Sequence, residues 1–250
     1  MRRLLLVAAV VALSATAAQA AYEEVAVTDG GTLSGVVRFV GTAPRLDPLA
    51  VPRDRQTCGA QQSSEALVLG PERGVRGSVV LIEGVAKGKK ATGEVLLDSQ
   101  RCLFVSHVSA LAAGERARVK SSDTTVHNVR GFMGAASVFN LALPNRDQLV
   151  DITRRLTKPG VVRVVCDAHA HMFAWLVVHD SPYVAVTDDT GAFRIADIPP
   201  QTYRVTMWHE GFRSRGAGKD GRPLYDEPRT ITTQVTIAPR GAATVQFELK

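Results

Sequence analysis

The 250-residue sequence lacks the features that define several large protein classes. Its lysines and arginines form no cluster, so the formal net charge of +6 gives little support to nucleic-acid binding and only weak support to an acidic protein partner. No apolar stretch reaches the roughly 20 residues that a membrane span needs. The sequence contains no GxSxG or HExxH signature. We therefore expect a protein that is not an enzyme.

The first 20 residues have the pattern of a secretory signal peptide. Arg2 and Arg3 precede a short apolar run, and the small residues that follow end in Ala18-Gln19-Ala20. We expect cleavage after Ala20 and a periplasmic or secreted protein with no membrane span, the alternative being an uncleaved anchor. Loss of the two arginines would reduce the net charge from +6 to +4.

The remainder of the chain predicts an almost wholly β structure. Alternating apolar and polar residues recur between glycine, proline, asparagine and aspartate, and long amphipathic helices are lacking. This spacing is typical of β-sandwiches or open barrels. A change of composition near Asp180 predicts two units, residues 21–180 and 181–250. The expected strands are 32–41, 77–84, 93–98, 116–122, 160–166, 174–180, 192–198, 203–210, 232–238 and 243–249.

The three cysteines divide into two kinds. Cys58 and Cys102 lie among polar, turn-rich residues, whereas Cys166 follows the apolar run VVRVV. In an oxidising compartment exposed thiols tend to pair, so we expect a Cys58–Cys102 disulfide and a free Cys166. The alternative is that Cys58 and Cys102 are unpaired, buried, small apolar residues.

A soft-metal ligand set is concentrated between two strand-like runs, in VVRVVCDAHAHMFAWLVV (161–178). Cys166, His169 and Met172 recur at intervals of three, and His127 is the natural fourth ligand. One thiolate, two imidazoles and a thioether suit a single copper ion, whereas calcium or magnesium would want oxygen ligands. A tetrahedral zinc site that uses Cys166, His169 and His171 is the alternative.

Residues 103–178 resemble the cupredoxins, or blue copper proteins, and most closely their amicyanin- and plastocyanin-like members. The resemblance rests on LAAGERARVKSSD, on the segment His127-Asn128-Val129, and on KPGVVRVVCDAHAHM. It implies a Greek-key β-sandwich with one type 1-like copper ion. His127, Cys166 and His169 would be equatorial ligands and Met172 the axial one.

The ligand loop departs from the family pattern in two places. Ala170 and His171 stand where such loops tend to carry a proline and an aromatic residue, and His171 introduces a competing ligand. Asp167 adds negative charge beside the thiolate, which favours Cu(II) over Cu(I). The resemblance also implies that electrons pass through an exposed edge of His169, in a patch to which His171, Phe173 and Met133 contribute.

The chain from Ser181 onward resembles a second family, the carboxypeptidase regulatory-like or transthyretin-like β-sandwiches. The shared stretch is TDDTGAFRIADIPPQTYRVTMWHEG, in which Gly191 suits a tight turn and Pro199-Pro200 ends a strand. Such modules are generally not catalytic. If this smaller sandwich also uses the strand at 31–41, the copper unit is an insertion within it.

The remaining candidates have structural interpretations. His107, His179 and His209 are expected to be hydrogen-bonded strand histidines, Trp175 and Trp208 to be core or interface anchors, and residues 211–229 to be a solvated loop or a docking surface. The sequence as a whole predicts a one-electron carrier between redox partner proteins. A copper-binding or delivery protein and a non-catalytic interaction module are the alternatives.

Overall fold

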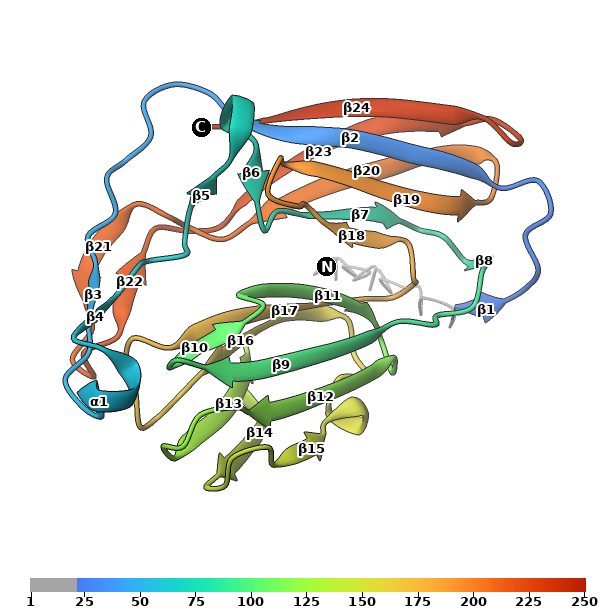
Figure 1. Ribbon diagram of the computed structural model, residues 1–250. Coiled ribbons are helices and arrows are strands. Elements are labelled where there is room, and N and C mark those ends of the chain that lie inside the picture. The colour runs from blue at the N-terminus through green and yellow to red at the C-terminus, as the bar shows by residue number, and fades with distance from the viewer. Residues whose placement is uncertain (1–21) are drawn as a thin grey trace, which may run out of the picture.

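The computed structural model describes residues 22–250, so the predicted signal peptide lies outside the described residues. The protein is all-β, as predicted: Figure 1 shows two stacks of strands, one above the other. Within 22–250 the helical structure is limited to α1 (Arg55–Cys58) and the 3-10 turns η1 (Pro71–Arg73) and η2 (Thr153–Arg155). No helix in this part of the chain is long and apolar enough to cross a membrane.

The first sandwich pairs a four-stranded sheet with a five-stranded sheet. Both sheets are mixed, because β9 and β12 run parallel in one and β11 and β17 run parallel in the other. The smaller sheet has the order β10 (Leu103–Val105), β9 (Glu94–Gln100), β12 (Arg116–Ser121), β15 (Leu149–Asp151). The larger has the order β11 (Val108–Ala112), β17 (Phe173–His179), β16 (Gly160–Val165), β13 (His127–Met133), β14 (Ala136–Leu143).

The second sandwich combines strands from both ends of the described chain. One sheet has the order β18 (Val184–Val186), β7 (Val79–Glu83), β20 (Gln201–His209), β23 (Arg229–Ile237). The other has the order β19 (Ala192–Ile198), β2 (Gly31–Phe39), β24 (Ala242–Leu249). The turn from Asp188 to Gly191 leads into β19, and Gly191 has a φ of 76°, which glycine adopts at little cost.

The strand pairing bears on the two units expected from the sequence. The last strand of the first sandwich, β17, ends at His179, beside the expected boundary at Asp180. The strands β2 and β7, however, pair within the second sandwich, although the expected first unit includes them. Their apolar side chains, such as Leu33 and Ile82, are buried in the core of that second sandwich. The chain therefore leaves this sandwich after β7, builds the first sandwich, and returns at β18.

The two sandwiches meet through a small apolar cluster of their own. Val79 and Trp208 from the second sandwich pack with Val108 and Val177 from the first. Trp175 lies edge-on to Trp208, with ring centroids 5.6 Å apart. The two tryptophans are thus interface anchors, and the cores on either side of them stay separate.

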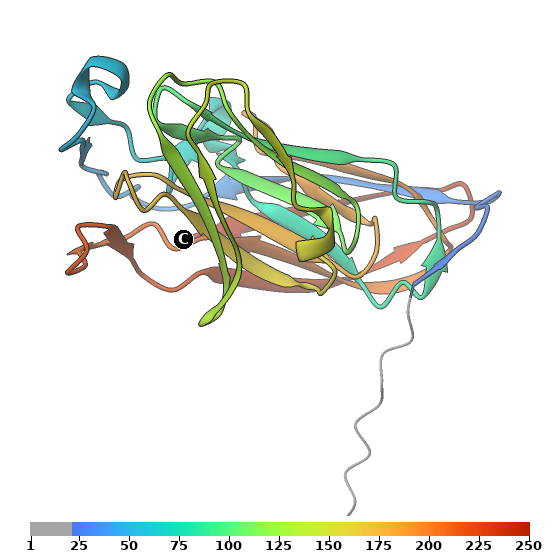
Figure 2. The same cartoon turned by 90° about the horizontal axis from the view of Figure 1, so that it is seen from below.

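Four short strand pairs complete the fold, and one of them carries α1 to the end of the first sandwich. The pair β3 (Leu49–Ala50) and β4 (Gln61–Gln62) brackets α1. We call residues 42–62 the cap segment. It lies at the same end of the molecule as the hairpin of β21 (Ser214–Ala217) and β22 (Pro223–Tyr225), as both views show (Figures 1 and 2). The remaining short strands are β1 (Glu23–Glu24), β8 (Lys87–Gly88), β5 (Val68–Leu69) and β6 (Val75–Arg76).

The predicted disulfide is confirmed, and it fastens the cap segment to the first sandwich. Cys58 at the end of α1 is bonded to Cys102, which lies in the turn between β9 and β10. Cys166 is the free cysteine and is buried, also as predicted. The cap segment is therefore joined covalently to the sandwich at the end where the ligand loop lies.

Candidate metal centre

Three of the four predicted ligand residues converge at one end of the first sandwich. His127 is the first residue of β13, and Cys166 comes directly after β16. Because β13 and β16 are antiparallel neighbours, the start of one strand lies beside the end of the other. The loop after Cys166 turns back through His169 to Met172, where β17 begins. Its chain reversal is fixed by the Met172 N–H, which donates to the His169 carbonyl at 3.0 Å.

The donor atoms are spaced for one metal ion. Cys166 Sγ lies 3.9 Å from His127 Nδ1 and 3.6 Å from His169 Nδ1. A metal bonded to sulfur at ~2.3 Å and to nitrogen at ~2.0 Å, with bonds about 120° apart, would hold those donors roughly 3.7 Å from each other. His127, Cys166 and His169 are all buried, and their ligand atoms lie within 4.8 Å of one another. The residues therefore fit a trigonal N₂S site.

The Cys166 sulfur is prepared to act as an anion. Burial raises the pKa of the thiol, but hydrogen bonds from His127, His169 and the Asn128 N–H outweigh that effect and lower the pKa to about 6. The hydrogen bond with the Cys166 sulfur in turn raises the pKa of His169 above its usual value. Since a thiolate, and not a thiol, binds metals, the sulfur is available to an ion at neutral pH.

Met172 is fully buried in the same apolar cluster as Cys166. The Met172 carbonyl accepts the Cys166 N–H at 3.3 Å, and this hydrogen bond joins the two ends of the loop. This places the residue next to the two strands that carry the loop. Its role as a weak axial ligand stays a prediction.

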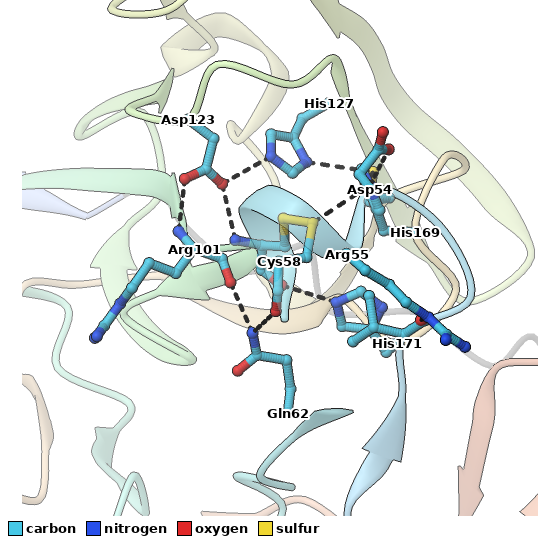
Figure 3. Close-up of a disulfide and its surroundings, with 12 residues drawn as sticks. Asp54, Arg55, Cys58, Gln62, Arg101, Asp123, His127, His169 and His171 are labelled. Carbon is cyan, nitrogen blue, oxygen red and sulfur yellow. Dashed lines mark hydrogen bonds and ion pairs between the residues drawn. A yellow bond between two sulfur atoms is a disulfide. The ribbon is translucent and has the colours of Figure 1, made fainter. Parts of the chain in front are cut away.

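The outer nitrogens of both histidines face carboxylates that the sequence analysis did not single out. His127 Nε2 lies 2.9 Å from Asp123 Oδ2, and His169 Nε2 lies 2.9 Å from Asp54 Oδ2 (Figure 3). Asp54 precedes α1 in the cap segment and is 115 residues away from His169 in the chain. The one feature of the sequence that could have indicated Asp54 is its position four residues before Cys58, because the predicted disulfide brings this part of the chain to Cys102.

The exposed histidine edge that the resemblance implied is absent. His169 is 1% exposed and His171 is 3% exposed, and Phe173 is buried as well. The expectation of an exposed electron route through His169 is therefore wrong. The physical reason is the cap segment: Asp54 and the disulfide lie against His169, with Cys58 Sγ 3.8 Å from its Nε2.

His171 is turned away from the cluster of donors. Its Nε2–H donates to the Cys102 carbonyl at 3.0 Å. Burial lowers the pKa of this imidazole to about 4, so it is neutral at physiological pH. It lines a cleft of about 320 Å³ between the cap segment and the β21–β22 hairpin. Among the described residues, the group that brings together Cys166 and His169 contains His127 and not His171.

The basic loop at 211–229 contributes directly to the ligand loop. Arg222 donates one hydrogen bond to the Cys166 carbonyl at 2.9 Å and another to Asp167 at 3.0 Å. The guanidinium thus offsets the negative charge that Asp167 would otherwise place beside the sulfur. This part of the loop is neither free nor fully solvated, since the Arg222 side chain is 13% exposed.

The other three histidines make the hydrogen bonds expected of strand residues. His107 contacts the Phe173 carbonyl at 3.1 Å and the Glu210 carboxylate at 2.5 Å, and Glu210 also accepts from Trp175. His209 donates to the Glu210 carbonyl, and His179 bonds to the Ile82 carbonyl at 3.0 Å. These residues lie at or beside the junction of the two sandwiches and not at the donor cluster.

Comparison with known proteins gives neighbours in structure only. No family model matches the sequence, and no curated protein matches it. Among solved structures, the copper-containing nitrite reductase of Thermus scotoductus is 18% identical, with a TM-score of 0.31 over 36% of this chain. This chain spans 23% of that reductase. Two amicyanin structures cover 40% of this chain and 98% of their own: a methionine-to-alanine mutant with Cu(I), at 18% identity and a TM-score of 0.30, and a reduced Cu(I) proline-to-glycine mutant at pH 4, at 17% and 0.29.

Proposed function

We propose that this chain is an exported mononuclear copper protein that carries single electrons between redox partner proteins. The observation that carries the proposal is the approach of the Cys166 sulfur to the Nδ1 atoms of His127 and His169, in a buried setting. A thiolate with two imidazoles and a weak thioether is the donor set of blue copper electron-transfer sites. The neighbouring solved structures include copper proteins by their titles.

Copper, when bound, would supply a one-electron couple between Cu(I) and Cu(II). His127, Cys166 and His169 would hold the ion, and Met172 is proposed as a fourth, weaker ligand. The Nε2 atoms of both imidazoles are hydrogen-bonded to carboxylates. These bonds restrict the movement of the imidazoles when the copper ion changes its oxidation state. The reaction itself needs no substrate pocket at the metal, and we propose no enzyme activity.

A second candidate function is copper holding or delivery. It is favoured by the burial of His169 beneath Asp54 and the disulfide, which separates the ligand from a docking partner. The two candidates differ in their expected spectra. A carrier gives an intense thiolate-to-copper band with Cu(II) and is reduced reversibly, whereas a delivery protein binds Cu(I) tightly without such a band.

The experiment is a copper titration of the protein without its first 20 residues. We expect one equivalent of Cu(II) to produce the visible band and ascorbate to bleach it reversibly. Cys166→Ser should abolish the band, because it removes the sulfur donor. His171→Gln is the matched control, since it alters a buried histidine of the same loop that faces Cys102. If His171→Gln also abolishes the band, the ligand set is Cys166, His169 and His171, as in the zinc alternative. If the wild-type protein retains no metal, the interaction-module alternative remains.

A further inference from the structure

We propose that Asp54 and Asp123 are positioning residues for the two histidine ligands, and that the Cys58–Cys102 disulfide holds Asp54 in that role. The inference rests on the proposed copper function, and it assigns a purpose to two carboxylates and a disulfide that the donor set does not use. Together they determine which oxidation state of the metal the site favours.

The hydrogen bonds place a carboxylate acceptor at the outer nitrogen of each imidazole. A neutral imidazole has one N–H and one lone pair. In both histidines the Nε2 atom lies 2.9 Å from a carboxylate oxygen, while Nδ1 is the atom nearest to the Cys166 sulfur. The carboxylate accepts the Nε2–H, so once a metal ion displaces the Nδ1 proton that faces Cys166, the Nδ1 lone pair is directed toward that ion. Partners of this kind orient metal-bound histidines and raise their basicity.

Asp123 is itself held by the backbone. Its carboxylate accepts the N–H of Arg101 at 2.6 Å and that of Cys102 at 2.8 Å, in addition to the contact with His127. The side chain is 7% exposed. Three donors hold this buried carboxylate in place, so little solvent lies between it and the metal position.

Asp54 is placed differently. Its side chain is 45% exposed, and its backbone is in the left-handed region, with a φ of 52°. The Asp54 carbonyl accepts the Cys58 N–H at 2.9 Å, so the residue is rigidly connected to Cys58 through one helical turn. The disulfide then ties that turn to Cys102, whose own N–H is bound by Asp123. Asp54 therefore depends on the disulfide, whereas Asp123 does not.

Two anions in contact with the ligands stabilise Cu(II) more than Cu(I), because the attraction grows with the charge of the ion. Replacing aspartate by asparagine removes the charge and keeps the shape and the acceptor oxygen. We expect Asp123→Asn to weaken Cu(II) binding relative to Cu(I) by about tenfold, which for a one-electron couple is a rise in reduction potential of ~59 mV. We expect a smaller rise for Asp54→Asn, since solvent screens that carboxylate.

The test measures the reduction potential of the copper-loaded protein by spectroelectrochemistry. Asp167→Asn is the matched control, because Asp167 follows Cys166 directly but pairs with Arg222 and not with a ligand. It should shift the potential less than Asp123→Asn does. A double-mutant cycle adds the disulfide: in a Cys58→Ser, Cys102→Ser background, Asp54→Asn should have a smaller effect than in the wild type, and Asp123→Asn an undiminished one.

The outcomes separate the two proposals. If wild-type protein shows the thiolate-to-copper band but neither Asp54→Asn nor Asp123→Asn raises the potential above that of Asp167→Asn, the positioning roles are refuted and the copper function stands. Without a band in the wild type, the electron-carrier function fails, and tight binding of Cu(I) would then favour the delivery function. A measurement on metal-free protein is independent of both: ¹⁵N NMR should show a proton on Nε2 of His127, and Asp123→Asn should lower the occupancy of that proton.

Discussion

The Asp54 carboxylate lies 2.9 Å from His169 Nε2, on the side of the imidazole opposite to the Cys166 sulfur. A residue from the cap segment thus covers the edge through which the His169 imidazole would otherwise meet solvent or a partner. His169 is 1% exposed as a result. This relationship distinguishes the site from one whose histidine is open to docking.

Opening that edge should speed the exchange of electrons and of metal. We expect Asp54→Ala to increase, several-fold, both the rate of reduction of the copper protein by a small hydrophilic reductant and the rate of copper removal by a chelator. The reason is that the substitution removes the group that covers the Nε2 edge. Stopped-flow absorbance of the thiolate-to-copper band measures both rates. Asp47→Ala, which changes an exposed residue of the same segment, is the control; equal rates in all three proteins would show that the cap does not limit access.

The thiol of the metal-free protein should titrate well below its ordinary range. Cys58 and Cys102 are joined, so Cys166 is the free cysteine of the chain and its ultraviolet thiolate absorbance can be followed directly. We expect a midpoint near the pKa of about 6, with thiol below it and thiolate above it. Cys166→Ser should lack the transition, and His127→Gln should move the midpoint upward, because one stabilising hydrogen bond is lost. A midpoint near that of free cysteine would contradict the geometry.

Removing the disulfide should destabilise the fold. The two cysteines are 44 residues apart, and in the chain-entropy model a loop of this length contributes about 4 kcal/mol by restricting the unfolded chain. We expect the Cys58→Ser, Cys102→Ser variant to lose free energy of unfolding of that order in urea titrations. Addition of a dithiol should destabilise the wild type and leave the variant unchanged. If the dithiol affects both alike, its effect does not act through this bond.

The junction between the sandwiches contains a pH-dependent ion pair. Burial lowers the pKa of His107, but the Glu210 carboxylate, with smaller help from Glu65 and the Phe173 carbonyl, outweighs it and raises the pKa above the ordinary value. The stability that the protonated histidine adds is therefore complete below about pH 6.5 and declines as the pH rises through the higher folded-state pKa. We expect His107→Gln to flatten this part of the stability profile. Glu210→Gln should cost about 3 kcal/mol, since it leaves a buried imidazolium without its partner.

Chemical unfolding across a pH series measures that profile. His179→Gln provides a control, because it also removes a buried histidine but leaves the pair of His107 and Glu210 intact. A His107→Gln profile with the same slope as the wild type above pH 6.5 would assign the dependence to other groups.

The parts of the fold and site that the sequence predicted correctly have local patterns. Alternation of apolar and polar residues identified ten of the β strands but not β11, β13 or β14. The disulfide followed from the two cysteines in polar turns. The spacing within 166–172 is short enough for one loop to bring its side chains together. His127 was singled out by the segment His127-Asn128-Val129, and the structure places that segment at the start of β13.

The parts that were missed depend on contacts between distant segments. Asp54, Asp123 and Arg222 are ordinary polar residues in turns, and nothing in their immediate sequence indicates a partner. Asp54 reaches His169 across 115 residues, and Arg222 reaches Cys166 across 56. The burial of His169 and His171 was unpredictable for the same reason, since the cap segment that covers them belongs to the connection between β2 and β7.

The pairing of β7 with β18 bears on how the molecule could be divided into two parts. β7 and β18 are neighbours in one sheet, so a short hairpin could replace everything between them and leave the parent sandwich with its strands in register. The piece removed would carry His127, Cys166, His169 and Met172, yet it would lack Asp54 and Cys58, which stay behind with the host. Neither fragment contains the complete candidate metal centre together with Asp54 and the disulfide, so moving the insert into another scaffold would require the cap segment to be moved with it.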